Sequence, residues 1–129
     1  MTDPPLTTPV LHELEAEVMD ALWDRDEATV RDVMDVLNRA APKPRAYTTY
    51  MTILRRLHDK GLLARRREGK TDFYRPVHSR DEYADLRAGS EVAALVDAFG
   101  DVALGHFARQ MAGLDPERRE ALERLAGER

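Results

Sequence analysis

Arginine and threonine side chains recur at helical spacing between positions 45 and 56 of this 129-residue chain. On a helix, one side would carry Arg45, Thr48, Thr52, Arg55 and Arg56. A guanidinium group can make two hydrogen bonds to a phosphate or to a guanine edge, and threonine offers a hydroxyl to phosphate and a methyl to thymine. The pattern therefore predicts a surface that lies against DNA. The alternative is an ordinary charged face that only keeps the protein solvated.

The opposite side of the same segment predicts how that surface is held. Tyr50, Ile53, Leu54 and Leu57 follow the i, i+3, i+4, i+7 spacing of a buried stripe. The preceding segment "AAPKPR" (40–45) cannot be helical, because each proline lacks an amide donor and restricts the residue before it. We therefore expect a helix that begins near Ala46 or Tyr47 and ends near Gly61, a residue that commonly terminates helices.

A second basic segment follows directly. "LLARRREGKTDFYRPVH" (62–78) alternates in polarity and contains turn residues, which predicts a two-stranded hairpin with Gly69 and Lys70 at its tip. Arg65 and Arg67 would share one face of the first strand and Arg66 the other, and Pro76 favours an edge position for the second strand. The complete set of predicted DNA contacts is Arg45, Tyr47, Thr48, Thr49, Met51, Thr52, Arg55, Arg56, Arg65, Arg66, Arg67 and Lys70.

Net charge supports this interpretation once it is divided along the chain. The total is −4, but residues 1–38 carry −8, residues 39–80 carry +9 and residues 81–129 carry −5. A basic central third between acidic flanks points to a polyanionic partner for that third.

The elements around the basic third suggest a fold. We expect a frayed leader at 1–8, then a helix whose first turn suits Pro9, and a second helix opened by a Thr29–Asp32 capping box. Three helices followed by a hairpin is the order of a winged helix-turn-helix. The predicted fold is therefore mainly α with a small β-hairpin: a winged-helix DNA-binding domain at 1–78, followed by a helical dimerisation region at 79–129.

The region after residue 78 repeats helix signals. Ser79 with Glu82 forms a capping pattern, Gly100 breaks the helix, Asp101 could cap the next one, and Asp115 opens a last one. A complete winged domain already has its own core, so we expect the apolar residues of this region to pack against a second copy of the chain. The resulting homodimer should bind a palindromic operator. The alternative is that the tail folds back on its own domain. The predicted dimerisation residues are Leu86, Val92, Val96, Phe99, Leu104, Phe107, Met111, Leu122 and Leu125.

Catalytic, metal and membrane functions find no support in the sequence. The chain has no cysteine, only Ser79 and Ser90 as serines, and four histidines without metal-ligand spacing, so we expect no enzymatic activity, no metal and no cofactor. The longest apolar run is five residues, against the roughly 20 of a membrane helix. No lysine or arginine precedes Arg25, which disfavours a secretory signal, and we expect a cytoplasmic protein without membrane insertion. A protein-interaction module stays an alternative, whereas RNA binding lacks exposed aromatic platforms.

Three segments carry a family resemblance: "LEAEVMDALW" (14–23), "AYTTYMTILRRLHDKGLL" (46–63) and "EGKTDFYRP" (68–76). They resemble the BlaI/MecI penicillinase repressor family. The resemblance implies a homodimeric winged-helix transcriptional repressor that dimerises through its C-terminal helices. It also implies release from the operator when a membrane sensor protease, responding to a β-lactam, causes a cut in the tail. The family's recognition helix matches Thr48, Thr49, Met51, Thr52 and Arg56.

The chain departs from the family pattern in its tail. The family's cleavage site is an Asn-Phe pair, and the corresponding pair here is His106-Phe107. Copper-responsive relatives carry a cysteine-rich tail, which this chain lacks. The resemblance thus implies a repressor of a β-lactam resistance or cell-wall stress operon, with a ligand-responsive repressor for a different inducer as the alternative.

Overall fold

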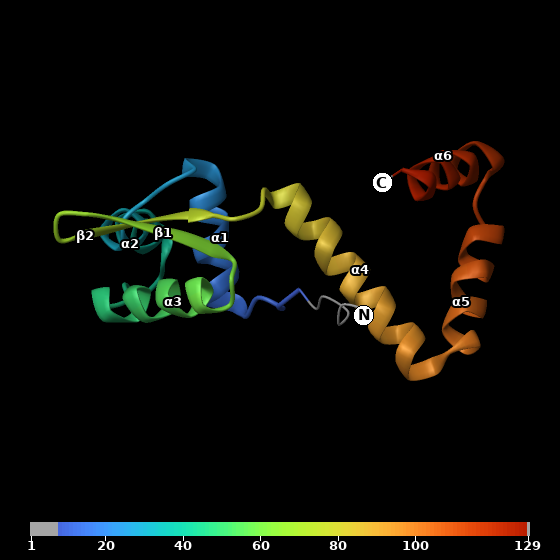
Figure 1. The fold of residues 1–129 in the computed structure, drawn as a ribbon, viewed down its shortest axis with the longest axis horizontal. Coiled ribbons are helices and arrows are strands. Elements are labelled where there is room, and N and C mark those ends of the chain that lie inside the picture. The colour runs from blue at the N-terminus through green and yellow to red at the C-terminus, as the bar shows by residue number, and fades with distance from the viewer. Residues whose placement is uncertain (1–7, 129) are drawn as a thin grey trace, which may run out of the picture. The chain divides into compact units, whose positions relative to one another are not determined.

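The computed structural model describes residues 8–128. Along this part of the chain the elements are α1 (Glu13–Arg25), α2 (Val30–Ala40), α3 (Tyr47–Asp59), β1 (Leu63–Glu68), β2 (Thr71–Pro76), α4 (Arg80–Phe99), α5 (Asp101–Ala112) and α6 (Pro116–Gly127), as Figure 1 shows. The predicted leader at 1–8 lies outside the described residues except for Thr8. None of the helices within residues 8–128 combines the length and the apolar character that a membrane crossing requires.

The first compact unit ends at Arg87 and contains a single core. Helices α1, α2 and α3 contact one another, α1 also contacts β2, and α3 also contacts β1. The predicted stripe of α3 is confirmed, because all four of its apolar residues are buried. The largest fully buried side chains of the unit include Met19, Leu22, Tyr50, Leu54, Leu57 and Tyr74.

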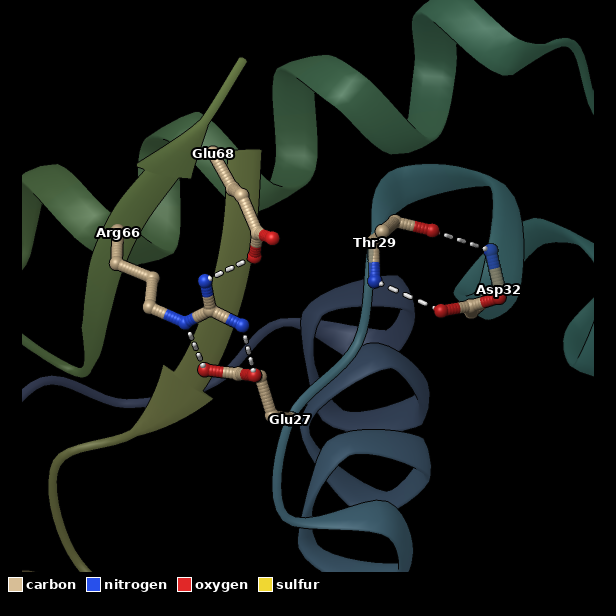
Figure 2. Close-up of polar contacts among 5 residues, drawn as sticks. All are labelled: Glu27, Thr29, Asp32, Arg66 and Glu68. Carbon is tan, nitrogen blue, oxygen red and sulfur yellow. Dashed lines mark hydrogen bonds and ion pairs between the residues drawn. The ribbon is translucent and has the colours of Figure 1, made fainter. Parts of the chain in front are cut away.

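Helix α1 begins later than its sequence suggested. Pro9 lies before the helix and not in its first turn, because the backbone stays extended through His12 (φ −76°, ψ 165°). Glu15 Oε1 accepts a hydrogen bond from the backbone N–H of His12 at 3.0 Å, which satisfies the amide at the start of the helix. The Thr29–Asp32 capping box of α2 is confirmed: Asp32 Oδ2 accepts from the Thr29 amide at 3.0 Å and Thr29 Oγ1 from the Asp32 amide at 3.1 Å (Figure 2).

Strands β1 and β2 form the predicted antiparallel hairpin, with Arg65 opposite Tyr74 and Arg66 opposite Phe73. Gly69 occupies the first position of the two-residue turn with a φ of +63°, as a type II′ turn requires. The expectation of an edge position for β2 is wrong at Tyr74. Its backbone exchanges two 2.9 Å hydrogen bonds with Ala28 on the side away from β1, so β2 lies between β1 and the α1–α2 connection there.

The boundary between the two units falls inside α4 and not before it. Tyr83 and Arg87, in the first turns of α4, donate hydrogen bonds to the carbonyls of Pro9 (2.6 Å) and Thr8 (3.1 Å). The Tyr83 ring also lies 5.6 Å from that of Trp23. These contacts join the start of α4 to the first unit, and the second unit begins at Ala88.

The second unit consists of helix segments with almost no interior. The Ser79–Glu82 cap at the start of α4, which still belongs to the first unit, is confirmed, with hydrogen bonds of 2.7 and 3.1 Å. Gly100, with a φ of +58°, separates α4 from α5, as predicted. The N-cap of α5 is Gly100 and not the expected Asp101, which is already the first residue of the helix. Asp115 caps α6 as predicted. Ala103 is the only buried residue that the structure describes in this unit.

Candidate nucleic-acid interface

The outer face of α3 is solvent-exposed along its whole length. Thr48, Thr52, Arg55 and Arg56 are all exposed, which confirms the facing predicted for the helix. Tyr47 is 41% exposed, whereas Thr49 and Met51 are half-buried, and Met51 packs against the core. The structure therefore presents a ridge of hydroxyl and guanidinium groups on a helix whose other face is anchored in the core.

The start of α3 is fixed by one amide side chain. Asn38, near the end of α2, donates to the Arg45 carbonyl and accepts from the Arg45 amide, both at 3.0 Å. The same Oδ1 accepts the hydroxyl of the buried Tyr50 at 2.7 Å. The N-cap residue of α3, Ala46, offers no side-chain cap. Asn38 thus takes over the positioning of the turn that leads into the exposed face.

The end of α3 is anchored by a buried carboxylate. Glu15 of α1 is 1% exposed, and Lys60, which follows the last residue of α3, places its Nζ 2.9 and 2.8 Å from the two carboxylate oxygens. Burial would raise the pKa of Glu15, but the hydrogen bonds from Lys60 and the His12 amide outweigh it and the pKa is lowered. With Asn38 at one end and Glu15 at the other, α3 has a polar anchor at each terminus.

The hairpin lies beside α3 and carries the second set of predicted contacts. Figure 1 shows its tip at the same end of the unit as the beginning of α3. Between them lies a groove of about 420 Å³ whose lining comes from the start of α2, from α3 and from the hairpin. Its lining includes Arg31, Tyr47, Met51, Arg55, Arg67, Lys70 and Thr71. The groove therefore brings residues predicted separately on the helix and on the hairpin to one place.

Several of the cations predicted on α3 and on the hairpin lack an acidic partner. Among residues 8–128, the exposed side chains of Arg55, Arg56, Arg65 and Lys70 form no ion pair within 4.0 Å. Arg67 Nε lies 3.8 Å from Asp72 Oδ1, and Arg45 Nη2 lies 4.0 Å from Glu17 Oε2. Most of the predicted cations are thus available to an external anion.

Arg66 differs from the other predicted contacts. Its guanidinium donates to both carboxylate oxygens of Glu27, at 3.1 and 2.9 Å, and to Glu68 at 2.6 Å (Figure 2). These hydrogen bonds raise the pKa of Arg66, those from Glu27 most strongly, and the pKa of Glu27 is lowered chiefly by the hydrogen bonds from Arg66. Arg66 and its cross-strand neighbour Phe73 lie on one face of the hairpin, and Tyr74 lies on the other. Arg66 is thus already hydrogen-bonded within the chain.

Sequence reasoning missed Arg31 as a member of the candidate interface. It lies in the first turn of α2, lines the groove, and places its guanidinium carbon 5.8 Å from the centre of the Tyr47 ring. Dividing the charge along the chain had hidden it in the acidic third. One signal in the sequence could have identified Arg31: it stands two residues after Thr29, the N-cap of the helix that precedes α3.

The predicted dimerisation residues are exposed or half-buried in the single chain, and none of them is fully buried. Val92, Phe99, Leu104 and Leu125 are exposed, at 44%, 61%, 49% and 62%. Leu86, Val96, Phe107, Met111 and Leu122 are half-buried. Leu95 and Val102, which the sequence reasoning did not include, are exposed too, and both line an apolar groove of about 410 Å³ with Phe99, Ala103, His106 and Phe107.

Comparison with known proteins agrees with this architecture. Residues 11–128 match the family model described as "Penicillinase repressor". The chain is 42% identical over 124 residues to "Transcriptional regulator BlaI" of two Mycobacterium tuberculosis strains, CDC 1551 / Oshkosh and ATCC 25618 / H37Rv, over 91% of this chain and 86% of each relative.

A solved structure supports the fold. The solution structure of the DNA binding domain of the repressor BlaI superposes with a TM-score of 0.52 at 27% identity, over 60% of this chain and 92% of that one. The predicted winged-helix fold is therefore confirmed. Because the family pattern extends from α1 to the end of α6 and the curated relatives align over nine-tenths of the chain, this protein belongs to the penicillinase repressor family.

Proposed function

We propose that this protein is a DNA-binding transcriptional repressor without enzymatic activity, which inserts α3 into the major groove and places the hairpin on the neighbouring phosphates. The observation that carries the proposal is the exposed threonine and arginine face of α3, joined by one groove to Arg67 and Lys70 of the hairpin. Side chains of these types supply base contacts and phosphate contacts respectively. The curated relatives are transcriptional regulators by name, and the matching solved structure is a DNA binding domain.

Roles within the interface follow from chemistry and position. Thr52 and Arg56 lie on the face of α3 that would meet base edges, whereas Lys70 lies at the hairpin tip, where a flexible ammonium group suits phosphate. Thr52→Ala or Arg56→Ala should lower operator affinity by roughly 1 to 3 kcal/mol if it removes a base contact, while Lys70→Ala should weaken all DNA sequences about equally. The assignment is reversed if the hairpin variant alters sequence preference and the helix variants do not.

A salt titration tests DNA binding itself. For each phosphate neutralised, the logarithm of affinity should fall with the logarithm of salt concentration with a slope of about −0.9. Gel shifts with genomic fragments at low salt should show binding that weakens along this line. A complete absence of binding at low salt would favour the alternative of a protein-interaction module.

The proposal includes a homodimer formed through the region 79–129. Six large apolar side chains of the second unit are exposed, and three of them, Leu95, Phe99 and Val102, line one apolar groove. A contiguous apolar patch of this kind commonly marks a protein–protein interface. Two joined half-site readers make the second binding step intramolecular, which should raise affinity for a palindromic operator by about 10²- to 10⁴-fold. A fragment that ends near Gly100 should keep the winged-helix fold, sediment as a monomer and release the operator; a dimeric fragment would contradict this.

We further propose that induction acts on the tail. Regulated cleavage near His106-Phe107, triggered through a membrane sensor protease, would free a repressor of a β-lactam resistance or cell-wall stress operon. Gly105 lowers helix stability there by roughly 1 kcal/mol relative to alanine, which eases the local opening that proteolysis needs. Blotting after exposure of the host to a β-lactam should reveal a shortened chain. If target genes switch on while the chain stays intact, a ligand-responsive mechanism with a different inducer replaces this one.

A further inference from the structure

Arg66 is the one hairpin arginine whose guanidinium is bound on two sides by carboxylates among the residues that the structure describes. Its Nε and Nη2 donate to the two carboxylate oxygens of Glu27, and its Nη1 donates to Glu68. The same guanidinium stacks over the Phe73 ring, with 4.4 Å between its central carbon and the ring centre (Figure 2 shows the carboxylates). A guanidinium fork has five donors, and three of them are used inside the protein.

The partner of Arg66 lies at the point where the hairpin meets the α1–α2 connection. Glu27 precedes Ala28, which exchanges two 2.9 Å backbone hydrogen bonds with Tyr74 of β2. Two residues beyond Glu27, Thr29 caps α2. The Arg66–Glu27 contact therefore spans from β1, across β2, to the connection that also sets the start of α2.

The geometry points to a positioning role for Arg66: we propose that Arg66 and Glu27 lock the hairpin to the α1–α2 connection, and that Arg66 does not contact DNA phosphate. The lock sets the distance between Lys70 at the hairpin tip and α3 on the far side of the groove. The expected effect on DNA binding rests on the proposed function, whereas the contact between Arg66 and Glu27 and its effect on the hairpin do not.

Alternation along β1 supports the division of roles. Arg67 lies across from Asp72, and both residues line the groove beside α3, whereas Arg66 lies across from Phe73 on the other face of the hairpin. Isolated surface ion pairs contribute little, but a bidentate arginine–carboxylate pair within a network is the recognised exception. Within the part of the chain that the structure describes, two N–H donors of Arg66 stay free, but they lie beside the carboxylates of Glu27 and Glu68, whose negative charges would repel a phosphate.

Hydrogen exchange on the protein without DNA tests the lock. In Arg66→Gln and in Glu27→Gln, the amides of Ala28 and Tyr74 should exchange faster than in the wild type, because the bridge loses its flanking support. Lys70→Gln, a charge-matched control on the same hairpin, should leave both amides unchanged. Unchanged exchange in Arg66→Gln would overturn the proposal.

Salt titrations with a fluorescein-labelled, mixed-sequence DNA duplex test the second half. Lys70→Gln should reduce the salt slope by about 0.9, the effect of one lost phosphate contact. Arg66→Gln should lower affinity by about 5-fold, the upper range for an exposed ion pair, while the slope stays that of the wild type. A slope that falls in Arg66→Gln as much as in Lys70→Gln would show Arg66 to be a phosphate contact and the proposal to be wrong.

An exchange of charges provides the sharpest contrast. The double variant Glu27→Arg/Arg66→Glu keeps the net charge and restores the pair between positions 27 and 66, although it loses the contacts of Arg66 with Glu68 and Phe73. Affinity and amide protection should therefore be about 2-fold or more above those of Arg66→Glu alone. The control Glu27→Arg/Lys70→Glu also keeps the net charge, but its new carboxylate at position 70 does not face position 27. Its DNA affinity and the protection of its Ala28 and Tyr74 amides should therefore stay below those of the wild type. Failure of the first double variant to recover both readouts would refute the lock. If the wild type bound no DNA, the proposed function would fail, and amide exchange would still decide the lock.

Discussion

Two polar side chains, Asn38 and Glu15, hold the two ends of the exposed helix α3. Asn38 serves three hydrogen bonds with one amide, and two of them satisfy the backbone of Arg45. Glu15 carries a negative charge in the interior and is balanced by Lys60. Buried polar groups are costly without partners, so each of these side chains ties α3 to the place where its partners lie.

Replacement of Asn38 should cost stability in proportion to the partners left unpaired. Asn38→Ala leaves the Tyr50 hydroxyl and both backbone groups of Arg45 without their partner, which should lower the free energy of unfolding by about 2 to 3 kcal/mol. Tyr50→Phe removes a single hydrogen bond and should cost about 1 kcal/mol. Urea denaturation measures both. Equal losses in the two variants would show that the Arg45 contacts contribute nothing.

The Glu15–Lys60 pair predicts a specific dependence of stability on pH. The pKa of Glu15 in the folded state is lowered from its ordinary value of 4.5. Its stabilising contribution is therefore complete above that value and is lost as the pH falls through the lowered folded pKa. Glu15→Gln should flatten this part of the acid-stability curve. A curve for Glu15→Gln that falls as steeply as that of the wild type would exclude Glu15 as its source.

Replacement of Lys60, the partner of Glu15, should reverse the direction in which stability depends on pH. Lys60→Met leaves the buried carboxylate without its counter-ion, which should cost about 3 kcal/mol at neutral pH, the lower limit for breaking a buried pair because Lys60 remains partly exposed. Burial then raises the pKa of Glu15, so stability should increase on mild acidification. Thermal unfolding at a series of pH values would show either direction.

At the scale of elements, the connection between α1 and α2 organises the hairpin and the start of α2 together. It begins with Asp26, whose φ of +69° and ψ of −49° form a tight turn closed by a 2.8 Å hydrogen bond from the Glu27 amide to the Arg25 carbonyl. This conformation is strained for a residue with a side chain. The turn directs Glu27 toward Arg66 and leads into the Ala28–Tyr74 bridge and the Thr29 cap.

Relief of this strain should stabilise the protein. Asp26→Gly is expected to raise the free energy of unfolding by about 1 kcal/mol, since glycine adopts a positive φ without steric cost. The opposite substitution serves as the control: Gly61 has a φ of +81° and open space around the position of a Cβ, so Gly61→Ala should cost about 1 to 2 kcal/mol through backbone strain alone. A lower urea midpoint for Asp26→Gly would contradict the assignment of strain.

At the scale of the whole molecule, the two units differ in how they use their apolar residues. The first unit buries them in one core, whereas the second exposes six large apolar side chains within residues 88–128. Water disfavours such a surface by roughly 25 cal/mol for each square ångström that could be covered. A second copy of the chain would cover it, in line with the proposed homodimer.

Charges on this surface should prevent self-association without unfolding the first unit. Phe99→Asp with Val102→Asp places two carboxylates beside the apolar groove, and sedimentation should show a monomer at concentrations where the wild type is a dimer. Val77→Asp, at an equally apolar and exposed position of the first unit, should leave the dimer intact. A double variant that still dimerised would place the interface elsewhere.

Local structure could be predicted from the amino-acid sequence. The stripe of α3, the Thr29–Asp32 and Ser79–Glu82 caps, the Gly61 and Gly100 breaks and the hairpin turn were all predicted, because periodicity and capping act between residues a few positions apart. Asp101 was misassigned as a cap because glycine and aspartate both favour that position. No local pattern predicts that Arg66 contacts Glu27, that Lys60 contacts Glu15, or that β2 pairs with Ala28, and these contacts are visible only in the folded chain. Those pairs lie about 40 residues or more apart in sequence, and packing of the helices and the hairpin around one core brings them together.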